Sequence, residues 1–97
     1  MEKVRAVHVS DSDTCVTLIS PAKAGDAVCF TEGGRGVSVT ANEDIPQWHK
    51  IAVKPVAKNG AVIKYGAVIG IALCDIAVGD YVHVHNMRSP GLGGENK

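Results

Sequence analysis

The sequence predicts a small all-β domain, a barrel-like body of short twisted strands, and three features of the chain point to it. No window keeps a helical period of apolar residues over the roughly 10 to 12 positions that would define a helix. Apolar runs are short and are separated by turn residues, with 11 glycines and 4 prolines among 97 residues. Aromatic residues make up only 4% of the chain, so we expect a compact core of small side chains rather than an aromatic-lined pocket.

The N-terminal half predicts two strands and a hairpin. The first strand (KVRAVHV) is followed by the turn residues Asp11-Ser12-Asp13, and the second strand stops at Ser20-Pro21. Further along, a glycine-rich tip from Gly33 to Gly36 lies between two apolar runs, as in a β-hairpin. The expected strands span residues 3–9, 14–19, 27–31 and 37–40.

The densest strand signal lies between Asn59 and Asn86, which reads as strand, turn, strand, turn and strand. Gly66 permits a bend between the first two of these strands. The stretch closes on YVHVH, in which apolar and polar residues alternate with period two.

This alternation predicts which way each side chain of the closing strand points. Tyr81, His83 and His85 fall on one face, and Val82 and Val84 fall on the inward face. Two imidazoles are thereby directed into the same space.

A faint internal repeat is also present. Residues 21–28, 44–51 and 75–82 align without gaps, and each is a short turn that leads into an apolar strand. Gly25 and Gly79 occupy a position where a positive φ is natural, whereas the middle copy has Trp48 there. The uneven spacing predicts three equivalent corners of one twisted β-body rather than a solenoid.

Size and charge limit the possible partners. A chain of 97 residues makes one domain with a modest core and little enclosed volume, so we expect a protein partner or a homo-oligomer. Ten acidic and ten basic residues give a formal net charge of zero, which argues against nucleic-acid or membrane-surface binding by bulk charge. Since no apolar run approaches the roughly 20 residues of a transmembrane helix and no signal peptide is visible, we expect a cytoplasmic protein.

The three cysteines, Cys15, Cys29 and Cys74, are widely spaced and odd in number. They form neither a disulfide framework nor a CxxC metal clip. We interpret them as small buried hydrophobic residues.

His83 and His85 are candidate metal ligands. On an extended strand their Cα atoms would lie about 6 to 7 Å apart, which allows two ring nitrogens to share one metal ion. The alternative is a pair of exposed polar residues on an edge strand. Two histidines are too few for a divalent site, and His49 is the other histidine with a distinctive motif around it.

Further candidates contact a substrate rather than a metal. His49 and Lys50 follow a turn and could orient a carboxylate or polarise a leaving hydroxyl, the alternative being a solvated pair. Asn86 and Arg88 follow the closing run and could bind substrate hydroxyls or a carboxylate, although a loop arginine is often only solvated.

Three motifs taken in order give the chain a family resemblance. They are DIPQWHKIAV at residues 44–53, VIKYGAVIGIA at 62–72 and AVGDYVHVHN at 77–86. Together they resemble the SAF-type N-terminal domain of the altronate and galactarate dehydratase family, which includes small subunits of sulfolactate sulfo-lyases. The resemblance implies a β-clip fold with long crossing loops for residues 1–88, and we expect residues 89–97 to be a flexible tail.

The resemblance also implies a function. Such a chain would be the small subunit of a metal-dependent hydro-lyase, inactive alone, that works with a separate large catalytic subunit. The enzyme would dehydrate a sugar acid such as altronate or galactarate to a 2-keto-3-deoxy acid, or remove sulfite from sulfolactate, with a divalent metal, usually iron. The rival hypothesis is a non-catalytic binding module for a carbohydrate or a protein.

The resemblance and the motifs together assign roles to six residues. His49 would be catalytic, in contact with substrate or metal, and we expect it to converge with the metal ligands His83 and His85 on one side of the domain. Substrate binding falls to Lys50, Asn86 and Arg88.

Two residues depart from the family pattern. Trp48 stands where the family usually has the glycine of Gly-His-Lys, which bulks up that corner. Tyr81 stands where relatives often carry a further histidine, which removes one candidate ligand.

Overall fold

The computed structural model describes residues 4–8 and 10–89, and within them every regular element is a β-strand. The all-β prediction is therefore confirmed. The strands are β1 (Val4–Val7), β2 (Cys15–Leu18), β3 (Ala27–Glu32), β4 (Arg35–Thr40), β5 (Lys50–Ala52), β6 (Ala61–Lys64), β7 (Ala67–Ala72), β8 (Tyr81–Val82) and β9 (Met87–Arg88).

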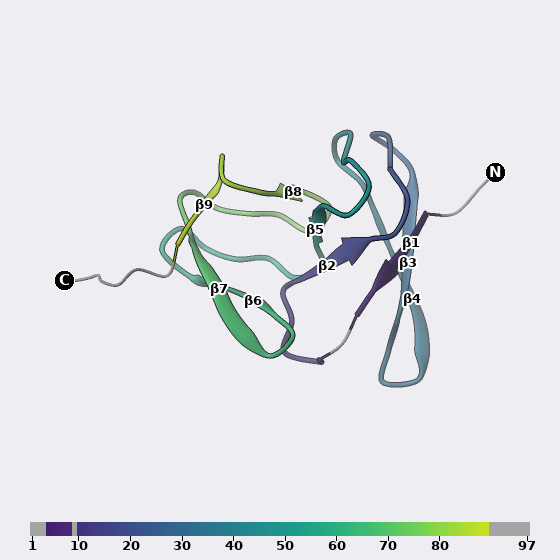
Figure 1. Cartoon of the computed structure of the whole chain (residues 1–97), viewed down its shortest axis with the longest axis horizontal. Helices are drawn as coiled ribbons and strands as arrows, with labels where there is room; N and C mark the ends of the chain where they lie inside the picture. The colour runs from purple at the N-terminus through teal and green to yellow at the C-terminus, as the bar shows by residue number, and fades with distance from the viewer. Residues whose placement is uncertain (1–3, 9, 90–97) are drawn as a thin grey trace.

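The strands form two open sheets, consistent with a small β-clip body, and neither sheet closes into a barrel. One sheet has the order β4-β3-β1-β2-β5-β8, and the other has the order β6-β7-β9. Strand β1 runs parallel to β3, whereas the remaining pairings are antiparallel. In Figure 1 the β3–β4 hairpin and the β6–β7 hairpin lie at opposite ends, with β2 and β5 between them.

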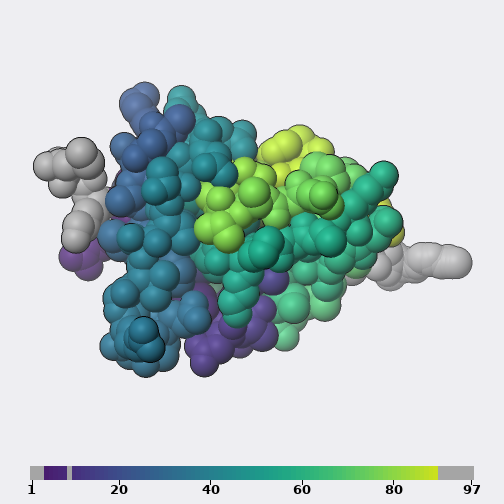
Figure 2. Space-filling model, turned by 180° about the vertical axis from the view of Figure 1, so that it is seen from behind, coloured from purple at the N-terminus to yellow at the C-terminus, as the bar shows by residue number. Residues whose placement is uncertain are grey.

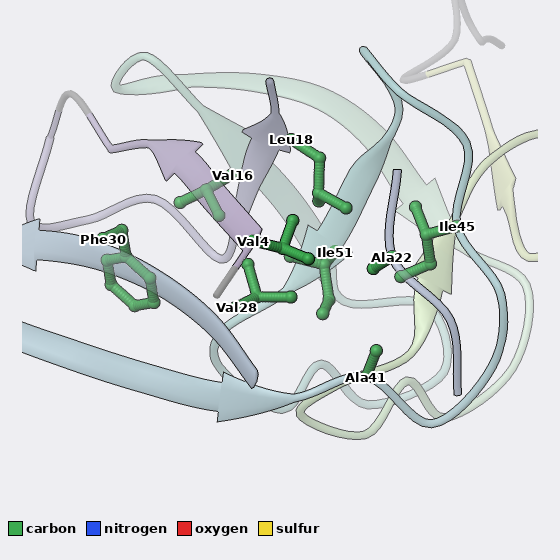
Figure 3. Close-up of a cluster of buried hydrophobic side chains, with 9 residues drawn as sticks. All are labelled: Val4, Val16, Leu18, Ala22, Val28, Phe30, Ala41, Ile45 and Ile51. Atoms are coloured by element: carbon green, nitrogen blue, oxygen red, sulfur yellow. The ribbon is translucent and has the colours of Figure 1, made fainter. Parts of the chain in front are cut away.

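Two clusters of buried side chains lie on opposite faces of β2 and β5. Alternation along β2 directs Val16 and Leu18 into the first cluster and Cys15 into the second. Full burial of each such aliphatic side chain contributes about 1.5 to 3 kcal/mol. The first cluster, drawn in Figure 3, contains Val4, Val16, Leu18, Ala22, Val28, Phe30, Ala41, Ile45 and Ile51. The second contains Cys15, Ala52, Val56, Val62, Ala72, Ile76 and Val82.

The predicted repeat of corners is present, and it has four copies rather than three. Each copy has a buried residue in an isolated bridge, then a turn with one positive φ, then the start of a strand. The copies are corner 1 (residues 21–28), corner 2 (44–51), corner 3 (55–62) and corner 4 (75–82). Their positive-φ residues are Gly25 (94°), Trp48 (70°), Asn59 (72°) and Gly79 (96°).

The corners are bridged in pairs, corner 1 to corner 2 and corner 3 to corner 4. Equivalent carboxylates support the two pairs, because Asp44 accepts the Ala24 N–H and Asp75 accepts the Lys58 N–H, each at 2.9 Å. The N-terminal and C-terminal halves of the chain therefore each carry one such corner pair.

Corner 4 also connects the two halves. The side-chain amide of Asn42 donates to the Val78 carbonyl at 3.0 Å and to the Asp80 carboxylate at 2.9 Å. Figure 2 shows this light-green corner seated against the blue and teal N-terminal half.

The predicted closing strand is shorter than expected. Strand β8 ends at Val82, and residues 83–86 form a turn in which Val84 is 72% exposed, so its predicted inward orientation is wrong. The cause is Asn86, whose buried side chain accepts the His83 N–H at 3.0 Å and donates to the Tyr81 carbonyl at 2.8 Å. Local side-chain hydrogen bonding thus overrides the alternating pattern.

The other strand predictions have mixed outcomes. The hairpin around Gly33 and Gly34 is confirmed as β3 and β4. Strand β5 begins where the repeat at residues 44–51 was predicted to lead into a strand, whereas the short strand β9 was not predicted. The predicted flexible tail lies outside the described residues apart from Ser89. Within the described residues, no helix is long and apolar enough to cross a membrane.

Candidate functional site

Three histidines and one tyrosine gather at the edge of the larger sheet. The ring centroids of His49 and His83 are 4.9 Å apart, and Tyr81 lies 5.6 Å from His83 and 5.4 Å from His85. The predicted convergence of the three histidines is confirmed. We call His49, Tyr81, His83 and His85 the ring cluster.

The pairing of β5 with β8 brings these residues together across 34 positions of sequence. In this antiparallel pair Ile51 lies opposite Tyr81 and Lys50 lies opposite Val82. One step beyond the pair, the same register places His49 across from His83. The Asn86 turn then folds His85 back toward Tyr81.

Tyr81 is the centre of the cluster and the functional candidate that sequence reasoning missed. Its hydroxyl lies 2.5 Å from His49 Nδ1, and the two rings meet edge to face at 64°. Its ring also stacks on His83 with only 13° between the ring planes. The alternation that placed Tyr81 and His83 on one face was the available signal for this contact.

In corner 2, His49 does not have to accept a backbone hydrogen bond from its own turn, because Pro46 has no N–H. In corner 4 the Asp80 carboxylate accepts the N–H of Ala77 at 2.8 Å, and corner 1 repeats this contact. Pro46 occupies the equivalent of Ala77 and has no N–H to satisfy. The imidazole of His49 is therefore free to face Tyr81.

Lys50 points away from the ring cluster. It pairs with Thr17 and Val82, on the opposite face of β5 from Ile51 and Tyr81. That face borders the second cluster of buried side chains. Its role in substrate binding stays a prediction.

The side chains of Asn86 and Arg88 hydrogen-bond backbone groups. Both polar atoms of the Asn86 side chain are used within the turn, so the structure gives this residue a scaffolding contact. Arg88 is exposed on β9 and donates to the Ser89 carbonyl at 3.3 Å. The substrate-binding roles of both stay predictions.

The ring cluster does not amount to a metal site within this chain. Across residues 4–8 and 10–89, no group of three or more His, Cys, Asp or Glu side chains is placed to hold a metal ion. A divalent ion needs at least three protein ligands or added carboxylates, so His83 and His85 do not suffice. Their role as metal ligands stays a prediction that requires groups from another chain.

Tyr81 also borders a hollow of about 480 Å³ on the side of corners 1 and 2. This volume is within the range of small-molecule sites. Pro21, Lys23, Asp26, Asp44 and Pro46 are among the residues that line it.

The pKa values of Asp13 and Cys15 are shifted from their usual range. Burial alone would raise the pKa of Asp13, but hydrogen bonds from the backbone N–H groups of Gly66, Tyr65 and Ser10 outweigh it and lower the pKa below its usual range. Burial raises the pKa of the Cys15 thiol to about 11. Asp13 holds the tip of the β6–β7 hairpin and Cys15 lies in the second cluster, so both groups serve the fold.

Comparison with known proteins gives a family match over most of the chain. A family model described as the altronate/galactarate dehydratase SAF domain matches residues 4–90. Altronate dehydratase of Escherichia coli (strain K12) is 50% identical over 52 residues, which cover 54% of this chain and 10% of that protein. Altronate dehydratase of Bacillus subtilis (strain 168) is 43% identical over 54 residues, 56% of this chain and 11% of that protein.

A further relative matches over nearly its whole length. The (2R)-sulfolactate sulfo-lyase subunit alpha of Chromohalobacter salexigens is 31% identical over 85 residues, which cover 86% of this chain and 90% of that protein. The chain thus spans about a tenth of the two altronate dehydratases and most of the sulfo-lyase subunit.

Proposed function

Because the chain belongs to the altronate/galactarate dehydratase SAF-domain family, we propose that it is the small subunit of a lyase that acts on a hydroxy acid. The family resemblance of the three motifs is confirmed by this membership. In the proposed reaction a sugar acid loses water to give a 2-keto-3-deoxy acid, and a separate large subunit shares the site. The near-complete match to a protein named as a subunit supports this division. We place the protein in the cytoplasm.

The observation that carries the proposal is the ring cluster at the sheet edge. Imidazole groups can donate hydrogen bonds to a carboxylate or to a departing hydroxyl, which are the oxygens of a hydroxy acid. The abstraction of a proton next to a carboxylate also needs a general base, and we assign that base to the large subunit. Of the four cluster residues, Tyr81 alone lines the neighbouring hollow, which the substrate could enter.

The divalent metal, iron by family resemblance, is likewise proposed to bind in the complex. The described residues lack a three-ligand group, so this chain alone would bind the ion weakly. The large subunit would complete the coordination shell.

Sulfolactate is the second candidate substrate, and one observation favours it. A relative that aligns with 85 residues of this chain is named as a subunit of a sulfolactate sulfo-lyase. A sulfo-lyase would release sulfite where a dehydratase releases water. Both substrates carry a carboxylate that the ring cluster could contact.

Reconstitution tests the proposal directly. The chain is co-expressed with a dehydratase-type large subunit from the same organism, and the purified complex is assayed with altronate, galactarate and sulfolactate, with and without added Fe²⁺. We expect a one-to-one complex that turns over one of these acids, and no turnover by either chain alone. Turnover by the 97-residue chain alone would refute the proposed division of labour.

A histidine variant then tests the site. His49→Ala should lower kcat of the complex by about 100-fold or more, as expected for loss of a group that acts on the reacting atoms. His8→Ala is the matched control, because His8 contacts Phe30 outside the ring cluster. Equal losses in the two variants would show that His49 has no special role.

A further inference from the structure

Tyr81 is held rigidly enough to direct the groups around it. Its N–H donates to the Glu43 carboxylate at 3.1 Å, and its carbonyl accepts the side-chain amide of Asn86 at 2.8 Å. Its half-buried ring packs against the first cluster of buried side chains. Backbone and ring are thus both fixed, so the position of the hydroxyl is fixed as well.

The hydroxyl of Tyr81 meets His49 at one ring nitrogen only. The oxygen is 2.5 Å from Nδ1, and this is the one hydrogen bond recorded for the His49 ring within the described residues. A phenol hydroxyl is the better donor of the two groups, and an imidazole lone pair is the better acceptor. The hydrogen bond therefore runs from Tyr81 to Nδ1.

This direction decides what His49 offers at its other nitrogen. A neutral imidazole carries a single N–H, so an Nδ1 that accepts leaves the proton on Nε2. Metal binding through Nε2 would require the opposite arrangement, with the proton on Nδ1. His49 could contact either substrate or metal on sequence grounds, and this geometry separates the two roles.

We propose that Tyr81 is a positioning residue that holds His49 in its Nε2–H form, so that His49 donates a hydrogen bond to a carboxylate or hydroxyl oxygen. His49 is then a contact for an oxygen-rich acid and not a metal ligand. The tautomer rests on the geometry of this chain, whereas the identity of the oxygen ligand rests on the proposed function. In place of the histidine of the family pattern, a candidate metal ligand, Tyr81 supplies a hydroxyl that fixes the tautomer of His49.

The tautomer is measurable in the isolated 97-residue chain. Long-range proton–nitrogen NMR on ¹⁵N-labelled protein at about pH 8, where imidazoles are mostly neutral, reports which ring nitrogen of His49 carries the proton. We expect the proton on Nε2. A proton found on Nδ1 would overturn the proposal, and this result needs no variant.

Tyr81→Phe tests the cause. The variant keeps the ring contacts with His83 and His85 but removes the hydroxyl, so the ratio of the Nδ1–H to the Nε2–H form of His49 should rise about 2- to 10-fold. Tyr65→Phe is the matched control, because Tyr65 is the other tyrosine of the chain and lies exposed on the β6–β7 hairpin. An unchanged ratio in folded Tyr81→Phe would overturn the proposal.

Zinc ions alone provide a third readout. Titration of Zn²⁺ into the wild-type chain should leave the Nε2 resonance of His49 without the shift that metal coordination causes. A metal-shifted Nε2 resonance would contradict the donor role. Because these measurements use the isolated chain, they can succeed where the activity screen fails, and the two proposals are refuted separately.

Discussion

Corner 2 and corner 4 have the same backbone path, but corner 4 stabilises the fold whereas corner 2 carries a residue of the candidate site. Each has a bridge residue, a turn, a positive-φ residue and a strand start, and their strands β5 and β8 pair with each other. Corner 4 carries Gly79 and Asp80, which are both used to hold the structure together. Corner 2 carries Trp48 and His49 at the same positions, where Trp48 is 64% exposed and the His49 ring bonds the Tyr81 hydroxyl rather than a backbone N–H of its own corner.

The difference shows how a repeated unit can acquire a function. The Asp80 carboxylate accepts the Ala77 N–H at 2.8 Å and the Asn42 amide at 2.9 Å, so a change there would cost stability. Pro46 removes the equivalent N–H from corner 2. Position 49 could then take an imidazole without loss of a structural hydrogen bond.

Gly79 should be the most sensitive position in this comparison. A Cβ at Gly79 would lie 2.2 Å from the Thr40 carbonyl oxygen, and its φ is +96°. We expect Gly79→Ala to lower the free energy of unfolding by about 3 kcal/mol, because a steric clash adds to backbone strain. Urea denaturation measures the loss.

Gly25→Ala is the control for that prediction. Gly25 has nearly the same φ, +94°, but a Cβ there would meet no atom within 4 Å. Its loss should be only about 1 kcal/mol, from backbone strain alone. Equal losses at the two glycines would show that the contact with Thr40 does not matter.

Asp13 tests whether a buried carboxylate also serves the fold away from the corners. Its carboxylate accepts the Gly66 N–H at 2.8 Å, and Asp13→Asn should cost about 1.5 to 3 kcal/mol of unfolding free energy near neutral pH. Because the folded-state pKa of Asp13 is lowered, this stability is present above the unfolded-state pKa of about 3.9 and is lost as the pH falls through the folded-state value.

Unfolding curves recorded from about pH 2 to 7 check this dependence. The gap between wild type and Asp13→Asn should narrow as the pH falls, whereas exposed Asp11→Asn should match the wild type throughout. A gap that stays constant with pH would mean that the charge of Asp13 is not the stabilising feature.

A smaller effect is expected at Trp48. Its φ of +70° is a strained value for a large side chain, and the side chain is 64% exposed. Trp48→Asn copies Asn59, the equivalent residue of corner 3 with a φ of 72°, and should stabilise the chain by about 0.5 to 1 kcal/mol. The reciprocal Asn59→Trp should destabilise it by a similar amount. A loss of stability in Trp48→Asn would mean that the indole packs usefully in the isolated chain.

The sequence predicted the parts of this fold that depend on local pattern. Alternating runs and glycine positions located the β3–β4 hairpin and three of the corners, and motif chemistry indicated that His49 would meet His83 and His85. Corner 3 was missed because Asn59 stands where two other corners have glycine.

Two features of the site depend on side-chain hydrogen bonds that the alternation of apolar and polar residues does not predict. The turn at His83 arises from the buried side chain of Asn86, which captures backbone groups that an extended strand would have left free. The bond between Tyr81 and His49 depends on the register of β5 with β8, across 32 positions. Period-two alternation gives the face of a strand but not its partner.

Asp80 in corner 4 accepts a backbone N–H of its own turn, whereas His49 at the equivalent position of corner 2 has no such N–H to bind because of Pro46. The most direct test is the unfolding free energy of His49→Ala beside that of Asp80→Ala, both measured in the isolated chain. Asp80→Ala should lose about 2 to 3 kcal/mol because two hydrogen bonds to a carboxylate disappear, whereas His49→Ala loses the one hydrogen bond to Tyr81 and should cost about 1 kcal/mol or less. A loss in His49→Ala as large as that in Asp80→Ala would contradict the account.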